Sequence, residues 1–131
     1  MSQENVEVAK AAYEAWNAGD METFRELYDP DIIMRPPERW PEPGPFVGRE
    51  GVMRQFGQLR ETWDADALEP TSDFIEAADH VVVRQIWRGA GYGPESNMEM
   101  TNVVTVRKGR IVYQEFFWDD AEALETVGLS E

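Results

Sequence analysis

The sequence contains no cysteine, and this absence excludes disulfide bonds, thiolate nucleophiles and zinc sites built on thiolates. It has no apolar run near the roughly 20 residues needed to span a bilayer. Its polar, acidic first residues, MSQEN, lack the basic and apolar stretches of a signal peptide. We therefore expect a cytoplasmic protein, because a reducing compartment suits a chain without cysteine.

Positive charge is also scarce, with 12 Lys and Arg against 26 Asp and Glu and a net charge of −14. A field of this sign repels phosphate backbones and anionic membranes, so we expect neither nucleic-acid nor membrane binding. The pairs Asp29/Asp31 and Asp64/Asp66 lack the further ligands of a calcium loop, which argues against a metal site. Gly89, Gly91 and Gly93 do not form the strand-to-helix glycine motif of a dinucleotide site, and we expect no cofactor.

What is present is enough for one folded domain over residues 1–131, since 42% of the residues are hydrophobic. Apolar residues recur at helical spacing early in the chain, and the predicted helices are 5–18, 21–28 and 49–63. The later part alternates like antiparallel sheet, and the predicted strands are 32–35, 67–76, 81–88, 98–107 and 111–118. A last short helix is predicted over 121–127. This order predicts an α+β fold in which three helices cover one face of a curved sheet and enclose a cone.

Local signals mark the ends of these elements. Gly19 is expected to end the first helix in a left-handed conformation, and Asp20 to cap the second. Asp119 or Asp120 is expected to cap the last one. Residues 36–45 hold five of the eight prolines around Trp40, which predicts a stiff loop that is either a lid over the mouth of the cone or a rigid surface connection.

Several segments, in order, are similar to those of one protein superfamily. Residues 13–20 (YEAWNAGD), 27–31 (LYDPD), 46–52 (FVGREGV), 79–83 (DHVVV), 108–112 (KGRIV) and 118–129 (WDDAEALETVGL) resemble motifs of the nuclear transport factor 2-like superfamily, in its SnoaL-like, polyketide cyclase-like branch. The resemblance covers nearly the whole chain. It implies a cone-shaped, cystatin-like fold with a cavity, and it leaves the chemistry open because this fold hosts many activities.

The catalytic residues of relatives do not carry over. Against the ketosteroid isomerase pattern the tyrosine falls on Ala12, with Tyr13 pointing elsewhere, the base falls on Pro36, and the second aspartate falls on Asn102. In an epoxide hydrolase-like pattern, Arg84 would have to lie inside, yet strand alternation places it outside. Three other side chains are candidates for acid–base work. Glu115 is expected to face outward and Asp119 to cap the last helix, while His80 is expected to lie in an exposed turn.

Alternation along the strands predicts which side chains line the cone. If Asn102 points in, so do its neighbours two residues away along the strand and the facing residues of the adjacent strands, while Glu99 and Glu115 point to solvent. The residues predicted to bind a ligand are Trp16, Met34, Trp40, Gln85, Trp87, Met100, Asn102, Gln114, Phe116 and Trp118. Three amides in an apolar interior are typical of a small-molecule site, although the same aromatics would also fill a closed core.

The outer sheet face is expected to pair two copies of the chain, because it is too apolar to stay wet. The predicted interface residues are Val82, Arg84, Ile86, Val103, Tyr113 and Phe117. Arg35 and Arg39, near the loop, either hold a ligand carboxylate or pair with Glu38 or Glu42.

Three functions therefore stay open. The first is binding of a small, mostly apolar molecule, with or without cofactor-free acid–base turnover of the isomerase or cyclase type. The second is a non-catalytic dimeric module with a filled cone. The third is an epoxide hydrolase-like enzyme.

Overall fold

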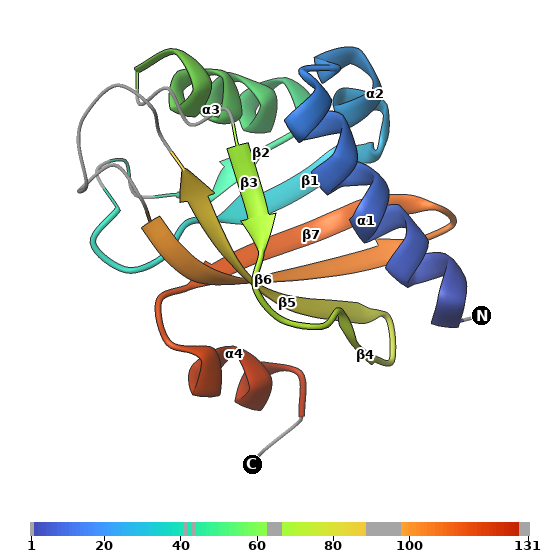
Figure 1. The fold of residues 1–131 in the computed structure, drawn as a ribbon. Helices are drawn as coiled ribbons and strands as arrows, with labels where there is room; N and C mark the ends of the chain where they lie inside the picture. The colour runs from blue at the N-terminus through green and yellow to red at the C-terminus, as the bar shows by residue number, and fades with distance from the viewer. Residues whose placement is uncertain (1, 41, 43, 63–66, 89–97, 129–131) are drawn as a thin grey trace.

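The computed structural model describes residues 2–40, 42, 44–62, 67–88 and 98–128. One curved sheet forms the centre of the fold, and three helices cover its concave face (Figure 1). These helices are α1 (Ser2–Ala18), α2 (Met21–Glu26) and α3 (Arg49–Thr62), and the fourth, α4 (Asp120–Thr126), lies against the opposite face. The α+β fold class predicted from the sequence is confirmed.

The N-terminal helices follow the predicted pattern closely. Along α1 the buried side chains include Ala9, Tyr13 and Trp16, which share one face of the helix. Gly19 has a φ of 74°, which a residue with a Cβ rarely adopts, and it ends α1 as predicted. The Asp20 side chain accepts a hydrogen bond from the Thr23 backbone N–H at 3.2 Å and caps α2. Trp63, predicted as the last residue of α3, lies outside the described residues.

The sheet runs in the order β2-β1-β7-β6-β5-β3, and β4 also pairs with β5. The strands are β1 (Tyr28–Arg35), β2 (Phe46–Val47), β3 (Ala67–Pro70), β4 (Ile75–Ala77), β5 (His80–Arg88), β6 (Met98–Arg107) and β7 (Arg110–Phe117). All pairings are antiparallel except β1 with β7, which is parallel. The long strands β5, β6 and β7 form the floor beneath the helices.

Three details of the sheet differ from the prediction. Strand β1 begins at Tyr28 instead of Ile32, because the ladder to β7 is irregular between Tyr28 and Ile33 and so tolerates Pro30, which has no N–H to donate. The predicted strand 67–76 is divided into β3 and β4, and β2 was not predicted. The predicted loop over residues 89–94 lies outside the described residues.

The predicted register of the long strands is confirmed. Asn102 on β6 pairs with Val83 on β5 and with Phe116 on β7. All three side chains are buried on the concave side, whereas Glu99 is exposed on the other face. The concave side therefore carries the core of the protein, and the convex side carries a second, smaller cluster.

That smaller cluster corrects the expected outer face. Helix α4, capped by Asp119, whose Oδ1 accepts from the Ala121 N–H at 3.0 Å, packs its Ala123 against the sheet. Val82 and Val103 are buried beneath it, so these two predicted interface residues are already covered within one chain.

Among the described residues, no helix is long and apolar enough to cross a membrane.

Candidate functional site

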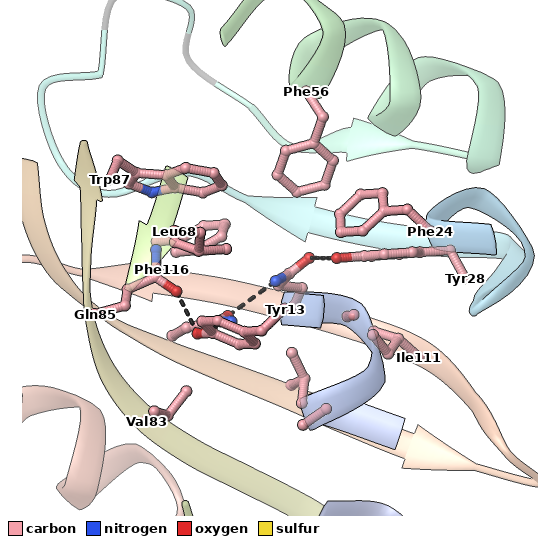
Figure 2. Close-up of a pocket in the computed structure, with 15 residues that line it drawn as sticks. Tyr13, Phe24, Tyr28, Phe56, Leu68, Val83, Gln85, Trp87, Ile111 and Phe116 are labelled. Carbon is pink, nitrogen blue, oxygen red and sulfur yellow. Dashed lines mark hydrogen bonds between the residues drawn. The ribbon is translucent and has the colours of Figure 1, made fainter. Parts of the chain in front are cut away.

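A chain of hydrogen-bonded polar side chains crosses the interior between the helices and the sheet (Figure 2). The Tyr28 hydroxyl donates to Gln114 Oε1 at 2.8 Å, and Gln114 Nε2 donates to Asn102 Oδ1 at 2.9 Å. Asn102 Nδ2 donates to the Tyr13 hydroxyl oxygen at 3.0 Å, and the Tyr13 hydroxyl donates to Gln85 Oε1. All five side chains are buried. We call this set the polar chain.

One of the five members comes from a helix, and four come from strands of the sheet. Tyr13 projects from α1, while Tyr28 opens β1 directly after α2. Gln85, Asn102 and Gln114 occupy inward positions of three adjacent strands, β5, β6 and β7. The polar chain therefore links helix α1 and strand β1 to the floor of the sheet through side chains alone.

Burial controls the acidity of the two tyrosines. Loss of solvation raises the pKa of Tyr13 well above its ordinary value, against a smaller lowering by its hydrogen bond with Asn102. Burial, followed by the proximity of Tyr13, also raises the pKa of Tyr28, against a smaller lowering by its hydrogen bond with Gln114. Both hydroxyls are therefore neutral at physiological pH, where they act as hydrogen-bond donors and not as bases.

These raised pKa values predict an alkaline loss of stability. Below the unfolded-state pKa of about 10, both states keep the tyrosines protonated; above it only the unfolded chain ionises, so the folded state loses stability as pH rises. Each buried tyrosine is expected to remove about 1 kcal/mol from the free energy of unfolding between pH 10 and pH 11. Urea titrations at a series of pH values measure this slope. Tyr28→Phe, which keeps the ring, is the control, and an equal slope in both proteins contradicts the assignment.

Aromatic rings surround the polar chain. The Trp16 ring centre lies 4.9 Å from that of Trp87, 5.2 Å from that of Phe24 and 5.7 Å from that of Phe56. All three pairs meet edge to face or nearly so, which is a favourable arrangement of ring quadrupoles. The interior is thus apolar except along the polar chain.

Two small hollows lie inside this aromatic interior. The inner hollow borders the polar chain and has a volume of about 10 Å³. The loop hollow lies beneath residues 36–40, against Met34, Leu59 and Met100, and also measures about 10 Å³. Phe56, Trp87 and Phe116 line both, so these three rings form the wall between them. Each hollow has about the room that a single water molecule needs.

The loop with Trp40 separates the loop hollow from an open cleft at the surface. Pro36, Pro37 and Trp40 line the loop hollow on one side and a cleft of about 390 Å³ on the other. The loop is held by the Trp118 indole N–H, which donates to the Glu38 carbonyl at 2.7 Å. Gln55 of α3 also holds the loop when its side-chain amide is oriented to suit both Glu42 and Trp40. Its nitrogen then donates to Glu42 Oε1 at 2.8 Å, and its oxygen accepts from the Trp40 indole N–H at 3.0 Å.

Most of the residues predicted to bind a ligand border one of the two hollows. Gln85, Asn102 and Gln114 line the inner hollow, Met34, Trp40 and Met100 line the loop hollow, and Trp87 and Phe116 line both. That they bind a ligand stays a prediction.

The other two predicted residues are placed differently. Trp16 is fully buried within the aromatic core and lines neither hollow. Trp118 does not face the interior as predicted, because it follows the end of β7 and stays 36% exposed.

Two tyrosines were missed as site residues. The sequence comparison placed Tyr13 pointing elsewhere, and this is wrong, since its hydroxyl lies between Asn102 and Gln85. A signal was available: Tyr13 lies on the apolar face of α1, and a buried tyrosine hydroxyl needs a polar partner. The amides predicted on the sheet were suitable partners.

Charged side chains lie outside this interior. Arg84 donates to Thr101 Oγ1 at 2.8 Å and to the Trp118 carbonyl at 2.9 Å on the convex face, which leaves no basis for the epoxide hydrolase-like arrangement. His80 is half-buried, not exposed, because its Nδ1 lies 2.8 Å from Thr105 Oγ1. Arg35 and Arg39 line the surface cleft, and neither forms one of the ion pairs found among the described residues.

The lining of the inner hollow also limits its chemistry. Its described residues include no Asp, Glu, His, Lys or Arg side chain. Over the described part of the chain, no group of three or more acidic or histidine side chains converges as a metal site would require. The groups available to a ligand here are neutral donors and acceptors and aromatic rings.

Together the curved sheet, the three covering helices and the apolar interior crossed by the polar chain define a protein of the nuclear transport factor 2-like class. The model of the SnoaL-like domain family matches residues 9–114, and the chain belongs to that family. No protein among those with curated descriptions matches it.

Solved structures agree with this assignment. A loop truncation variant of IdmH is 31% identical, with a TM-score of 0.63, and the match covers 86% of this chain and 90% of that one. A nuclear transport factor 2-like protein from Burkholderia pseudomallei is 21% identical, with a TM-score of 0.67 and coverage of 98% and 99%. A protein from Sinorhizobium meliloti named as a candidate polyketide cyclase is 20% identical, with a TM-score of 0.68 and coverage of 84% and 93%. The last two show the fold alone.

Proposed function

We propose that this protein binds a small, uncharged, mostly apolar organic molecule between its helices and its sheet. The observation that carries the proposal is the polar chain itself, five buried polar side chains in an interior otherwise built from apolar and aromatic groups. Burying an amide or hydroxyl is unfavourable unless it is hydrogen-bonded, and apolar side chains would fill the same space without that penalty. A few fixed polar groups in an apolar surrounding are what ligand sites use for orientation.

The route into this site runs beneath Trp40. That ring separates the surface cleft from the loop hollow, and Phe56, Trp87 and Phe116 separate the loop hollow from the polar chain. Because each hollow measures only about 10 Å³, a ligand has to displace these rings as it enters. In this proposal the protein closes over its ligand, and the described part of the loop, residues 36–40 with 42, 44 and 45, is its lid.

Replacing Trp40 with alanine tests this route. Tetralin, a bicyclic hydrocarbon, is a suitable probe because it is neutral and small. Its binding is followed by the fluorescence of the buried tryptophans in a stopped-flow instrument. We expect Trp40→Ala to raise the association rate constant roughly tenfold, because opening the lid no longer limits entry.

A matched control removes an aromatic ring from the convex face. Phe117→Ala takes away a half-buried ring that packs against α4, on the other side of the sheet, and is expected to leave the association rate unchanged. Equal acceleration in both variants would point to general loosening of the fold and would contradict the route. Failure of tetralin to bind either the wild type or Trp40→Ala would contradict the proposed function.

The small volume of the hollows favours a second candidate, a non-catalytic module with a filled cone. In that case the convex face is the working surface, and Arg84, Ile86, Tyr113 and Phe117 remain there for a dimer contact, whereas Val82 and Val103 are covered.

Similarity in fold to a candidate polyketide cyclase supports turnover of the cyclase or isomerase type as a further alternative. Acid–base turnover at neutral pH has less support, since the described lining holds no group that titrates there.

A further inference from the structure

We propose that the ligand of this interior carries a carbonyl oxygen, as a cyclic ketone or quinone does, and that this oxygen accepts a hydrogen bond from Gln85 Nε2. This inference rests on the proposed function and names the chemical class of the ligand. Gln85 is 0% exposed, yet its Nε2 has no hydrogen-bond partner among the residues that the structure describes. A buried amide N–H left unpaired costs free energy, and so it marks a position that an acceptor can fill.

The direction of the polar chain explains why Gln85 is its free end. The hydrogen bonds all run in one direction. The Tyr28 hydroxyl donates to Gln114, Gln114 donates to Asn102, and Asn102 donates to Tyr13. Tyr13 already accepts from Asn102, so its own hydrogen goes to Gln85 Oε1. The acceptor of Gln85 is therefore occupied and its donor is left over. Figure 2 shows the amide oxygen of Gln85 turned toward Tyr13 and the amide nitrogen turned away from it.

The surroundings of Gln85 select a neutral acceptor. The inner hollow around it is lined by apolar side chains such as Leu68, Val83 and Trp87, together with the other members of the polar chain. A carboxylate there would lose its hydration with no cation to pair with, which is strongly unfavourable. A carbonyl oxygen only accepts, whereas an alcohol also brings an O–H donor that needs an acceptor of its own. The amide oxygens of Gln85, Asn102 and Gln114 each already accept one hydrogen bond.

A single water molecule satisfies Nε2 less well than a carbonyl does. Buried waters usually make about three hydrogen bonds. Nε2 is the one amide nitrogen of the polar chain without a partner among the described residues, and most of the surrounding lining is apolar. A ketone needs only the one donor, and its ring system can replace contacts within the aromatic interior.

The test compares three probes with the same bicyclic skeleton: 1-tetralone, which has a carbonyl, 1-tetralol, which has a hydroxyl, and tetralin, which has neither. Dissociation constants are measured by calorimetry on the wild type and on Gln85→Leu. We expect the wild type to bind 1-tetralone roughly tenfold more tightly than tetralin, the value of one hydrogen bond to a buried donor. Gln85→Leu should bind the two equally. Gln58→Leu, the same change at an exposed position of α3, should keep the preference.

A second measurement needs no variant. The carbon-13 resonance of the carbonyl of labelled 1-tetralone moves downfield when its oxygen accepts a hydrogen bond, so the bound signal should lie downfield of the signal in cyclohexane. Equal binding of 1-tetralone and tetralin, a preference that survives in Gln85→Leu, a preference for 1-tetralol, or a bound resonance like that in cyclohexane would each overturn this inference and leave ligand binding intact. If none of the three probes binds, the proposed function fails, and the inference fails with it.

Discussion

Asn102→Asp is expected to fold at pH 4 and to lose about 4 kcal/mol of stability as the pH rises to 8. Asn102 is at the centre of the polar chain and only 4% exposed, so an aspartate there is taken out of water without a cation beside it. Burial of this kind raises a carboxyl pKa by about three units, and each unit corresponds to about 1.4 kcal/mol. Denaturant titration across this pH range measures the loss.

The sign follows from which state holds the proton. With a folded-state pKa raised above the unfolded value of about 3.9, the carboxyl is protonated in both states at low pH, and the stability is fully present there. As the pH rises, the unfolded chain ionises first, and stability is lost until the folded carboxyl ionises too. The protonated acid has one O–H in place of the amide N–H that Asn102 donates to Tyr13, so the polar chain can persist at low pH.

Asn102→Leu separates this charge effect from the loss of hydrogen bonds. It leaves Tyr13 and Gln114 each short of one partner, and we expect a loss of about 3 kcal/mol that does not change between pH 4 and 8. A loss in Asn102→Asp that is equally flat would mean that the carboxylate reaches water, and position 102 would then not lie in a closed interior.

The inward-facing residues of the sheet were predictable because strands have a strict period of two. Once Asn102 was assigned to the interior, Gln85 and Gln114 followed from alternation on the neighbouring strands, and all three are buried as predicted. The same logic placed Arg84 on the convex face, where it bonds to Thr101. The inward assignment of Asn102 was enough to set this register, and it agreed with placing Glu99 and Glu115 on the outer face.

What failed were predictions that depend on packing between elements distant in the sequence. Position 118 continues the alternation of β7, but the strand ends at Phe117, and the direction of Trp118 is then set by its hydrogen bond to Glu38. Tyr13 was misplaced because the rotation of a helix about its axis is set by its contacts with the sheet. The burial of Val82 and Val103 depends on where α4 folds back, which its own short sequence does not determine.

The interior volume was also beyond the reach of sequence. The same set of aromatic and amide side chains is compatible with an open cavity or a filled core, because the curvature of the sheet and the side-chain rotamers decide the space between them. The structure brings these rings close enough to leave hollows of about 10 Å³, and among the described residues the polar chain, with the unpartnered nitrogen of Gln85 at its end, distinguishes this interior from an ordinary apolar core.

Trp16→Ala is expected to lower the free energy of unfolding by about 4 kcal/mol, whereas Trp118→Ala should lower it by only about 1 kcal/mol. The sequence predicted both as lining residues, yet Trp16 is 0% exposed and Trp118 is 36% exposed. Trp16 packs against three rings and beneath the Arg60 guanidinium, 4.7 Å from its ring centre, so its removal leaves a large apolar cavity. Trp118 loses one hydrogen bond and a loose contact with Trp40, whose ring centre is 6.3 Å away.

Urea denaturation of the two variants side by side measures both losses, since each removes the same indole group. Cavity creation accounts for the difference, so a neutral apolar molecule such as benzene should restore part of the stability of Trp16→Ala and none of that of Trp118→Ala. Similar losses in the two variants would mean that Trp16 is not enclosed by the helices and the sheet.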